Sequence, residues 1–215
     1  MPTVVAIDGP AGAGKSTIAR NLADTLGFTY IDTGAMYRAV ALKALRAGLS
    51  FDDETRLEAL STASVIEFRP GRRTILDGED VTDSIRTPEV SSGASRIAAV
   101  GPVRAALVSK QRQMAESRDV VMEGRDIGTV VFPDATLKIF LDADPAERAR
   151  RRFTEQPGIP LDELTRQIAE RDSRDRNRTE SPLVQAPDAV RVDSTGLSPA
   201  EVAAEILKLI RRKDQ

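Results

Sequence analysis

The residues with the clearest chemical meaning form a glycine-rich segment near the N-terminus, Gly9-Pro10-Ala11-Gly12-Ala13-Gly14-Lys15-Ser16. This order fits G-x-x-x-x-G-K-S, a pattern that binds nucleoside triphosphates when it lies between a strand and a helix. Its glycines let backbone N–H groups turn toward phosphate oxygens, and the following helix start adds partial positive charge. Lys15 is predicted to reach the β- and γ-phosphates, and Ser16 to ligate Mg²⁺. The segment predicts triphosphate binding but leaves the fate of the phosphate open.

A second polar loop, Asp32 to Arg38, follows the next predicted strand. Thr33 supplies a hydroxyl, and Arg38 supplies a planar guanidinium that suits a phosphate. Asp32 is placed to orient water on Mg²⁺. The alternative is an ordinary helix-capping turn with a solvated Arg38.

A third polar loop, Glu123-Gly124-Arg125-Asp126, follows a later apolar strand. Glu123 is a second candidate for holding water on Mg²⁺, and Arg125 and Asp126 place a donor and an acceptor beside it. Ligands gather at the carboxyl ends of parallel strands, so we expect the three loops to face one crevice. The alternative for Arg125 and Asp126 is an internal salt bridge.

The segment Arg148 to Arg178 is dense in charge and has Pro157, Gly158 and Pro160 in its middle. It predicts two helices flanking a mobile turn, as in a lid. Residues that share a helix face by three- and four-residue spacing are Arg171, Arg174, Asp175 and Arg178. Arg148 and Arg152, four apart on the preceding helix, are predicted to clamp the donor phosphates. A solvated, salt-bridged helix is the alternative.

The apolar pattern predicts an α/β fold, a parallel sheet with helices on its faces. Five strands are expected at Val4–Ile7, Phe28–Ile31, Val120–Met122, Leu137–Leu141 and Ala189–Val192. Helices are expected at Lys15–Leu26, at Met36–Ala47, and after the capping box Ser198-Pro199-Ala200-Glu201. Between them, Ala63 to Val81 has strand-like runs separated by turn residues, including Asp77-Gly78, and predicts a small antiparallel insert.

Composition narrows the function classes. The 215 residues are 40% apolar and 30% charged, which is typical of a globular chain. Without cysteine or histidine, disulfides, thiol catalysis, Ser-His triads and His-ligated metals are excluded. No secretory signal or membrane-spanning run is recognised, and the absence of cysteine fits the cytoplasm. The net charge of −2 and the few aromatic residues disfavour nucleic-acid binding. A switch GTPase is disfavoured because the sequence lacks Asn-Lys-x-Asp, the motif with which such proteins recognise guanine.

Four motifs together resemble the bacterial cytidylate kinases. They are the segment 9–16, Asp32-Thr33-Gly34-Ala35-Met36-Tyr37-Arg38, Gly124-Arg125-Asp126-Ile127-Gly128-Thr129-Val130-Val131-Phe132-Pro133, and Arg171-Asp172-Ser173-Arg174-Asp175-Arg176. The resemblance runs almost end to end and implies a P-loop nucleoside monophosphate kinase fold with a five-stranded parallel core. It implies a single unit, with a core at 1–34, 92–147 and 179–215, a monophosphate-binding region at 35–91 carrying the β insert at about 63–81, and a helical lid at 148–178.

The resemblance also implies an activity, the ATP- and Mg²⁺-dependent phosphorylation of CMP and dCMP in pyrimidine nucleotide metabolism. The enzyme would be a cytoplasmic monomer that acts on small nucleotides. Some members carry Ser at position 33 and a longer lid turn, where this chain has Thr33 and Gln156-Pro157-Gly158. Alternatives are another small-molecule kinase, such as shikimate kinase or a different nucleoside monophosphate kinase, and a nucleotide-gated nucleic-acid-binding module.

The residue roles that the resemblance implies are as follows. Lys15, Arg125 and Arg178 would be catalytic. ATP would be bound by Gly9, Pro10, Ala11, Gly12, Ala13, Gly14, Lys15, Ser16, Thr17, Arg148 and Arg152. CMP would be bound through its phosphate by Thr33, Arg38, Arg125 and Arg178, through cytosine by Ser95, Arg104 and Asp126, and through the sugar by Arg171 and Asp175. Mg²⁺ would be held by Ser16, with Asp32 and Glu123 acting through water.

Overall fold

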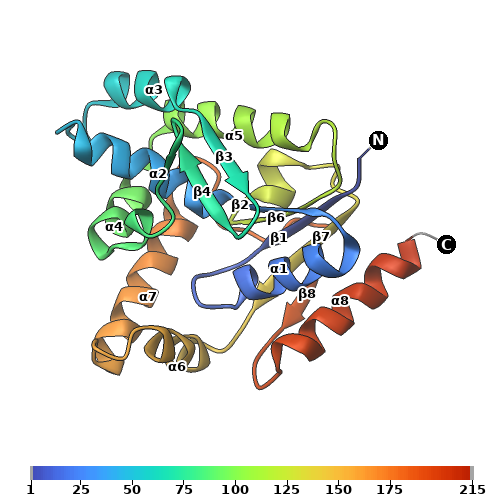
Figure 1. Cartoon of the computed structure of the whole chain (residues 1–215). Coiled ribbons are helices and arrows are strands. Elements are labelled where there is room, and N and C mark those ends of the chain that lie inside the picture. The colour runs from blue at the N-terminus through green and yellow to red at the C-terminus, as the bar shows by residue number, and fades with distance from the viewer. Residues whose placement is uncertain (1, 214–215) are drawn as a thin grey trace. The chain divides into compact units, whose positions relative to one another are not determined.

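Five strands form the main sheet of the protein, whose computed structural model describes residues 2–213 (Figure 1). They are β1 (Val4–Asp8), β2 (Thr29–Asp32), β6 (Val120–Gly124), β7 (Leu137–Asp142) and β8 (Val190–Asp193), in the order β2-β6-β1-β7-β8. Strand β1 pairs in parallel with β6 and β7, and β7 pairs in parallel with β8. The predicted α/β class and all five predicted strands are confirmed.

The chain divides into two compact units. The first comprises residues 2–30 and 115–213, as far as the structure describes them, and the second comprises residues 31–114. The finer division expected from the resemblance stays a prediction, and its outermost residues, 1, 214 and 215, lie outside the described part of the chain.

The helices of the first unit are α1 (Lys15–Leu26), α6 (Pro145–Glu155), α7 (Leu161–Asn177) and α8 (Pro199–Lys213). Helices α1 and α8 lie side by side, and their apolar faces share one core with β1, β6, β7 and β8 (Figure 1). In that core Leu22 and Ile206 are fully buried. The capping box is confirmed, because the Ser198 N–H donates to Glu201 Oε2 at 2.8 Å and the Glu201 N–H donates to Ser198 Oγ at 3.3 Å.

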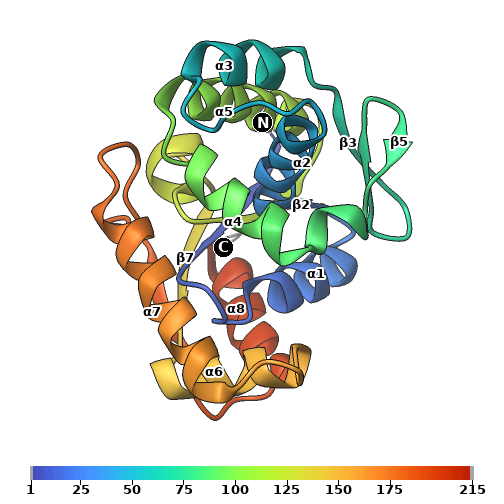
Figure 2. The ribbon, with the colours of Figure 1, turned by 90° about the vertical axis from the view of Figure 1, so that its left-hand side faces the viewer.

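The two helices expected in the segment 148–178 are present as α6 and α7, which pack against each other across a turn at residues 156–160 (Figure 2). That they act as a lid stays a prediction. The predicted shared face of α7 is correct only in part. Arg174 is exposed, and α7 ends at Asn177, so Arg178 already has extended backbone (φ −65°, ψ 140°). The buried polar residues of α7 are Asp175, which belongs to the predicted face, and Asp172, which does not. Their burial is explained by two arginine partners, Arg148 and Arg125, which spacing along α7 does not reveal.

The second unit holds α2 (Thr33–Arg46), α3 (Glu54–Ala63), a 3₁₀ turn at Ser84–Arg86, α4 (Pro88–Ile97) and most of α5 (Gly101–Ala115). Helix α2 begins three residues before the predicted Met36, because the Asp32 carboxylate accepts the N–H of Ala35 at 2.8 Å and caps the helix there. Helices α2 and α4 pack closely (Figure 2). Sequence patterns had not predicted α3, α4 or α5.

The antiparallel insert is confirmed within the second unit. Strands β3 (Ile66–Arg69), β4 (Arg73–Leu76) and β5 (Glu79–Asp80) form a separate sheet in that order. Asp77 and Gly78 link β4 to β5 with φ values of 50° and 89°, the left-handed conformations that a two-residue hairpin turn requires. Asp77 is fixed further by accepting the N–H of Val65 at 2.8 Å.

Candidate active site

The glycine-rich segment forms the connection between β1 and α1, as its motif requires. Gly9 has a φ of 151°, and a Cβ placed on it would lie 1.9 Å from the carbonyl oxygen of Leu141 in β7. Gly12 has a φ of 76°, and its Cβ would lie 3.1 Å from the Cβ of Arg148 in α6. Glycine is therefore needed at both positions for the loop to pack against β7 and α6.

Lys15 is the first residue of α1, and its side chain is buried. Its Nζ donates to the carbonyl oxygen of Pro10 at 2.7 Å, so the side chain folds back over the loop. Burial and the positive charge of Arg125 together lower the pKa of Lys15 to about 7, against an opposing effect of Glu123. Ser16 and Thr17 follow on the same helical turn, Ser16 half-buried and Thr17 exposed. A bound polyphosphate would stabilise the charged ammonium.

The two lid arginines predicted to bind ATP lie in different environments. Arg148 is buried, and its Nη1 donates to the carbonyl oxygen of Ala11 at 2.9 Å. Arg152 is exposed and donates to Glu155 at 3.1 Å. Only Arg148 contacts the loop through a hydrogen bond that the structure records.

Asp8, the last residue of β1, was not among the predicted site residues. Its buried carboxylate accepts the N–H groups of Ile127 and Gly128, each at 2.8 Å. These residues open a π-helical turn, Ile127–Val131, directly after Arg125 and Asp126. Burial raises the pKa of Asp8 to about 6, although the two backbone donors lower it. The one sequence signal was a charged residue ending an apolar strand at the motif.

A cluster of opposite charges joins the third polar loop to α7. Arg125 Nε donates to Asp175 Oδ2 at 2.8 Å, with the two side chains 17% and 11% exposed. Burial raises the pKa of Asp175, but the charges of Arg125 and Arg171 outweigh burial and hold it below its usual value. Arg178 Nη2 lies 3.7 Å from Asp126 Oδ1, and both side chains are 8% exposed. The first unit thus holds five of the residues predicted to bind CMP, and it pairs Arg125 with Asp175 and Arg178 with Asp126.

Glu123 ends β6 at the predicted position and is buried. Its Oε1 accepts the hydroxyl proton of Tyr30. The Tyr30 hydroxyl therefore helps to hold the carboxylate in place, and the charge of this carboxylate raises the pKa of Lys15.

The second unit carries the other predicted acceptor residues. Asp32 both caps α2 and pairs with Arg38 Nη2 at 3.0 Å, so the capping interpretation is correct and Arg38 is an ion-pair partner rather than a solvated residue. Thr33 is buried at the start of α2. The structure gives neither the buried Nε of Arg38 nor the buried Oγ of Ser95 a hydrogen-bond partner. Such atoms are suited to a polar ligand.

Arg104, on α5, is also buried. Its Nη1 donates to the carbonyl oxygen of Ala98 at 3.1 Å, and its guanidinium carbon lies 5.5 Å from the centre of the Tyr37 ring. A stacked guanidinium keeps its edge donors in a fixed plane, which suits recognition of a flat polar ligand.

The residues present fit a Mg²⁺ ion held mainly by nucleotide phosphates. Among the described residues, no group of three or more acidic side chains lies close enough together to hold a metal ion by itself. Mg²⁺ at nucleotide sites commonly takes one or two protein ligands and completes its shell with phosphates and water. Ser16 is half-buried in the first turn of α1, and Glu123 and Asp32, each in its own unit, already accept hydrogen bonds.

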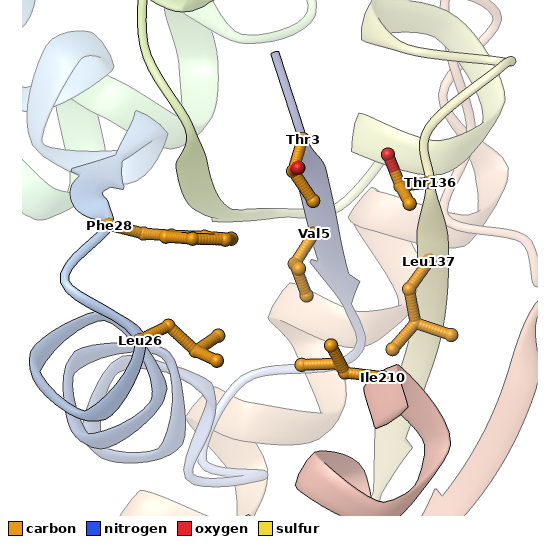
Figure 3. Close-up of a pocket in the computed structure, with 7 residues that line it drawn as sticks. All are labelled: Thr3, Val5, Leu26, Phe28, Thr136, Leu137 and Ile210. Atoms are coloured by element: carbon orange, nitrogen blue, oxygen red, sulfur yellow. The ribbon is translucent and has the colours of Figure 1, made fainter. Parts of the chain in front are cut away.

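A small, mostly apolar pocket lies at the other end of the sheet (Figure 3). It is lined by Thr3, Val5, Leu26, Phe28, Thr136, Leu137 and Ile210. Thr3 and Val5 lie at the start of β1, whereas the glycine-rich segment follows its end. The pocket offers no charged side chain, so it does not suit phosphate chemistry.

Solved structures share the fold of the chain. A gluconokinase from Sinorhizobium meliloti superposes with a TM-score of 0.51 at 16% identity, covering 98% of this chain and 93% of that one. A shikimate kinase from Acinetobacter baumannii, solved with shikimate, gives 0.50 at 15% identity, covering 99% and 94%. Together with the segment at 9–16, these likenesses define the fold as that of the P-loop kinases.

The family model for cytidylate kinase matches residues 5–212. The cytidylate kinase of Solibacter usitatus is 60% identical over 98% of this chain and 93% of its own length. That of Caldanaerobacter subterraneus is 49% identical, over 97% and 94%. The chain belongs to the cytidylate kinase family. No helix among the described residues is long and apolar enough to span a membrane.

Proposed function

We propose that the protein transfers the γ-phosphoryl group of ATP to CMP and dCMP, giving CDP and dCDP. The observation that carries this proposal is the family match over residues 5–212, which includes the glycine-rich segment and the Arg125–Asp175 cluster. Membership explains why a triphosphate loop and a set of buried arginines occur in one chain.

On the donor side, backbone N–H groups of residues 9–16 and the start of α1 bind the ATP phosphates. Lys15 exchanges its bond to Pro10 for the β- and γ-phosphates, whose charge keeps its ammonium protonated. Ser16 would hold Mg²⁺ directly, and Asp32 and Glu123 would act on it through water. When bound, Mg²⁺ neutralises charge on the β- and γ-phosphates. Thr17 and Arg152 complete the proposed donor contacts.

On the acceptor side, Thr33, Arg38, Arg125 and Arg178 hold the monophosphate. A CMP phosphate oxygen attacks the γ-phosphorus while the bond to the leaving ADP oxygen breaks. That nucleophile is already an anion, so no side chain has to remove a proton. The arginines reduce repulsion between the two phosphates, and positioning supplies most of the remaining catalysis. The lid helices exclude water that would hydrolyse ATP.

The cytosine base is read by Asp126, Arg104 and Ser95, and the sugar contacts Arg171 and Asp175. A carboxylate accepts the hydrogen of the cytosine amino group, and a guanidinium donates to the ring N3 or O2. The partner-free Oγ of Ser95 fits a base contact. We further propose that the protein works as a monomer in the cytoplasm. Light scattering of the purified chain tests the oligomeric state.

Phosphorus NMR of the protein with ATP and CMP tests the proposed reaction. We expect the CMP signal to be replaced by the two signals of CDP as ATP becomes ADP, and excess EDTA to stop the conversion. Release of inorganic phosphate without CDP would instead identify an ATPase. Conversion at an unchanged rate in EDTA would reject the role of Mg²⁺.

A further inference from the structure

The backbone of one residue in the glycine-rich segment, Ala11, is held at both its N–H and its carbonyl by side chains from α6 and α7. Its N–H donates to Asp172 Oδ1 at 3.3 Å, and its carbonyl oxygen accepts from Arg148 Nη1 at 2.9 Å. The same Nη1 lies 2.6 Å from Asp172 Oδ2, so the two side chains also bind each other. Three groups from three parts of the sequence thereby form a closed ring of hydrogen bonds.

The Arg148–Asp172 ion pair is almost completely withdrawn from water, with side chains 5% and 4% exposed. Arg148 Nε donates to the carbonyl oxygen of Ala143 at 3.1 Å, so its guanidinium is directed at backbone acceptors. Burying both charges is costly unless their hydrogen bonds are satisfied, and here loop backbone helps to satisfy them. The ion pair therefore both joins α6 to α7 and fixes the backbone of the glycine-rich segment at Ala11.

Close packing supports the same conclusion. The backbone of Arg148 approaches the next loop residue, Gly12, so closely that a Cβ there would lie 3.1 Å from the Arg148 carbonyl oxygen. Further along, the Ser194 hydroxyl lies 3.2 Å from the carbonyl oxygen of Ala13, and Arg151 donates to Ser194 Oγ at 2.9 Å. The loop is therefore supported at two carbonyls, and only the support at Ala11 comes from a buried ion pair.

We propose that Arg148 and Asp172 act as one positioning pair, which holds the backbone of Ala11 and so sets the shape of the loop for the donor triphosphate. Asp172 reaches ATP only through the loop, and Arg148 contributes mainly through Ala11 rather than by direct contact with phosphate. The role rests on the proposed binding of ATP at this loop and is independent of which acceptor is used.

The test measures binding of a non-hydrolysable ATP analogue with Mg²⁺, without acceptor, by calorimetry. For Asp172→Asn we expect the Kd to rise ~10-fold or more, because small displacements of a binding loop are costly. The Kd for CMP alone should change less than ~3-fold. Arg150→Ala, an exposed change on the same helix as Arg148, is the matched control and should bind the analogue like the parent.

Arg148→Met separates positioning from direct contact. Removal of either partner should weaken analogue binding similarly, and the double variant should be no weaker than the worse single variant, since both act through one pair. The double variant leaves no buried unpaired charge, so it remains testable if a single variant fails to fold. A double variant that binds the analogue like the parent would overturn the proposal.

Two other results would also overturn it. Loss of binding in Arg148→Met with parental binding in Asp172→Asn would identify Arg148 as a direct phosphate ligand. Equal weakening of analogue and CMP binding would indicate a general structural role. If the parent itself failed to bind the analogue, the proposed function would be wrong and the role of the pair would go with it.

Discussion

Replacing Asp8 by asparagine changes the charge of a buried group without changing its size. The Asp8 side chain accepts two backbone N–H groups of the turn that follows Asp126, yet burial raises its pKa from 3.8 to about 6. Each pKa unit is worth ~1.4 kcal/mol, so the ionised form costs the folded protein ~3 kcal/mol relative to the protonated form. At neutral pH the Asp8 carboxylate is therefore ionised, and its charge lowers the free energy of unfolding.

The sign of the pH dependence follows from the raised pKa. The folded state binds the proton more tightly than the unfolded state does, so this contribution to stability is complete below pH 3.8 and is lost as the pH rises through about 6. Asparagine cannot ionise, but its NH2 group cannot accept the second backbone N–H, so the variant loses one buried hydrogen bond at every pH. We expect the stability of Asp8→Asn relative to the parent to rise by up to ~3 kcal/mol between pH 4 and pH 8, about 6–12 °C in Tm, on top of the constant cost of the lost hydrogen bond.

Scanning calorimetry of parent and variant from pH 4.5 to 8 measures this difference directly. Asp134→Asn is the control, because this residue is exposed and lies just after the turn that Asp8 holds. This variant should follow the parent at every pH. A gap between Asp8→Asn and the parent that stays constant with pH would refute the reasoning, since it would mean that Asp8 does not titrate in this range.

Four other predictions follow from the site. Lys15→Met should keep the parental Tm but lose turnover by ~10²-fold or more, and turnover within ~10-fold of the parent would remove Lys15 from the chemistry. Because burial lowers the pKa of Lys15 to about 7, ATP binding at pH 8 should take up a proton, measured by calorimetry in buffers of different ionisation enthalpy and absent in Lys15→Met. Hydrogen exchange in residues 148–178 should slow when ATP and CMP analogues bind, and equal protection without them would reject a mobile lid. Asp126→Ala should lose CMP activity and narrow the CMP-to-UMP ratio in kcat/KM, whereas an unchanged ratio would place Asp126 on the phosphate side.

Local sequence signals predicted the sheet and the loop because those elements carry their own information. Apolar runs between turn residues located all five strands to within one or two residues. Helix α4 was not predicted, although its sequence carries a start signal. Thr87 caps the helix by accepting the N–H of Val90 at 3.3 Å, and Pro88 occupies its first turn. Helix α5 begins with Gly101-Pro102 and is only weakly amphipathic, so its sequence gave little indication of a helix.

The parts of the site that sequence did not predict depend on distant partners. The π-helical turn at Ile127–Val131 is held by Asp8, 119 residues away from Ile127. Spacing placed Asp175 on a charged face of α7 but did not predict that Asp172 and Asp175 are buried. Each of these carboxylates has an arginine from another segment to neutralise it. The sequence of α7 alone does not show which of its charged residues have partners in other segments. The burial of its aspartates could therefore not be predicted from that segment.

Specificity constants for a panel of acceptors with ATP test the central claim most directly. The panel is CMP, dCMP, UMP, AMP and shikimate, each measured with the parent protein under one set of conditions. We expect CMP and dCMP to be the preferred acceptors, with UMP disfavoured by ~10²-fold or more, since uracil would leave two buried polar groups mismatched at ~1–3 kcal/mol each. A larger kcat/KM for UMP, AMP or shikimate than for CMP would contradict the proposed function.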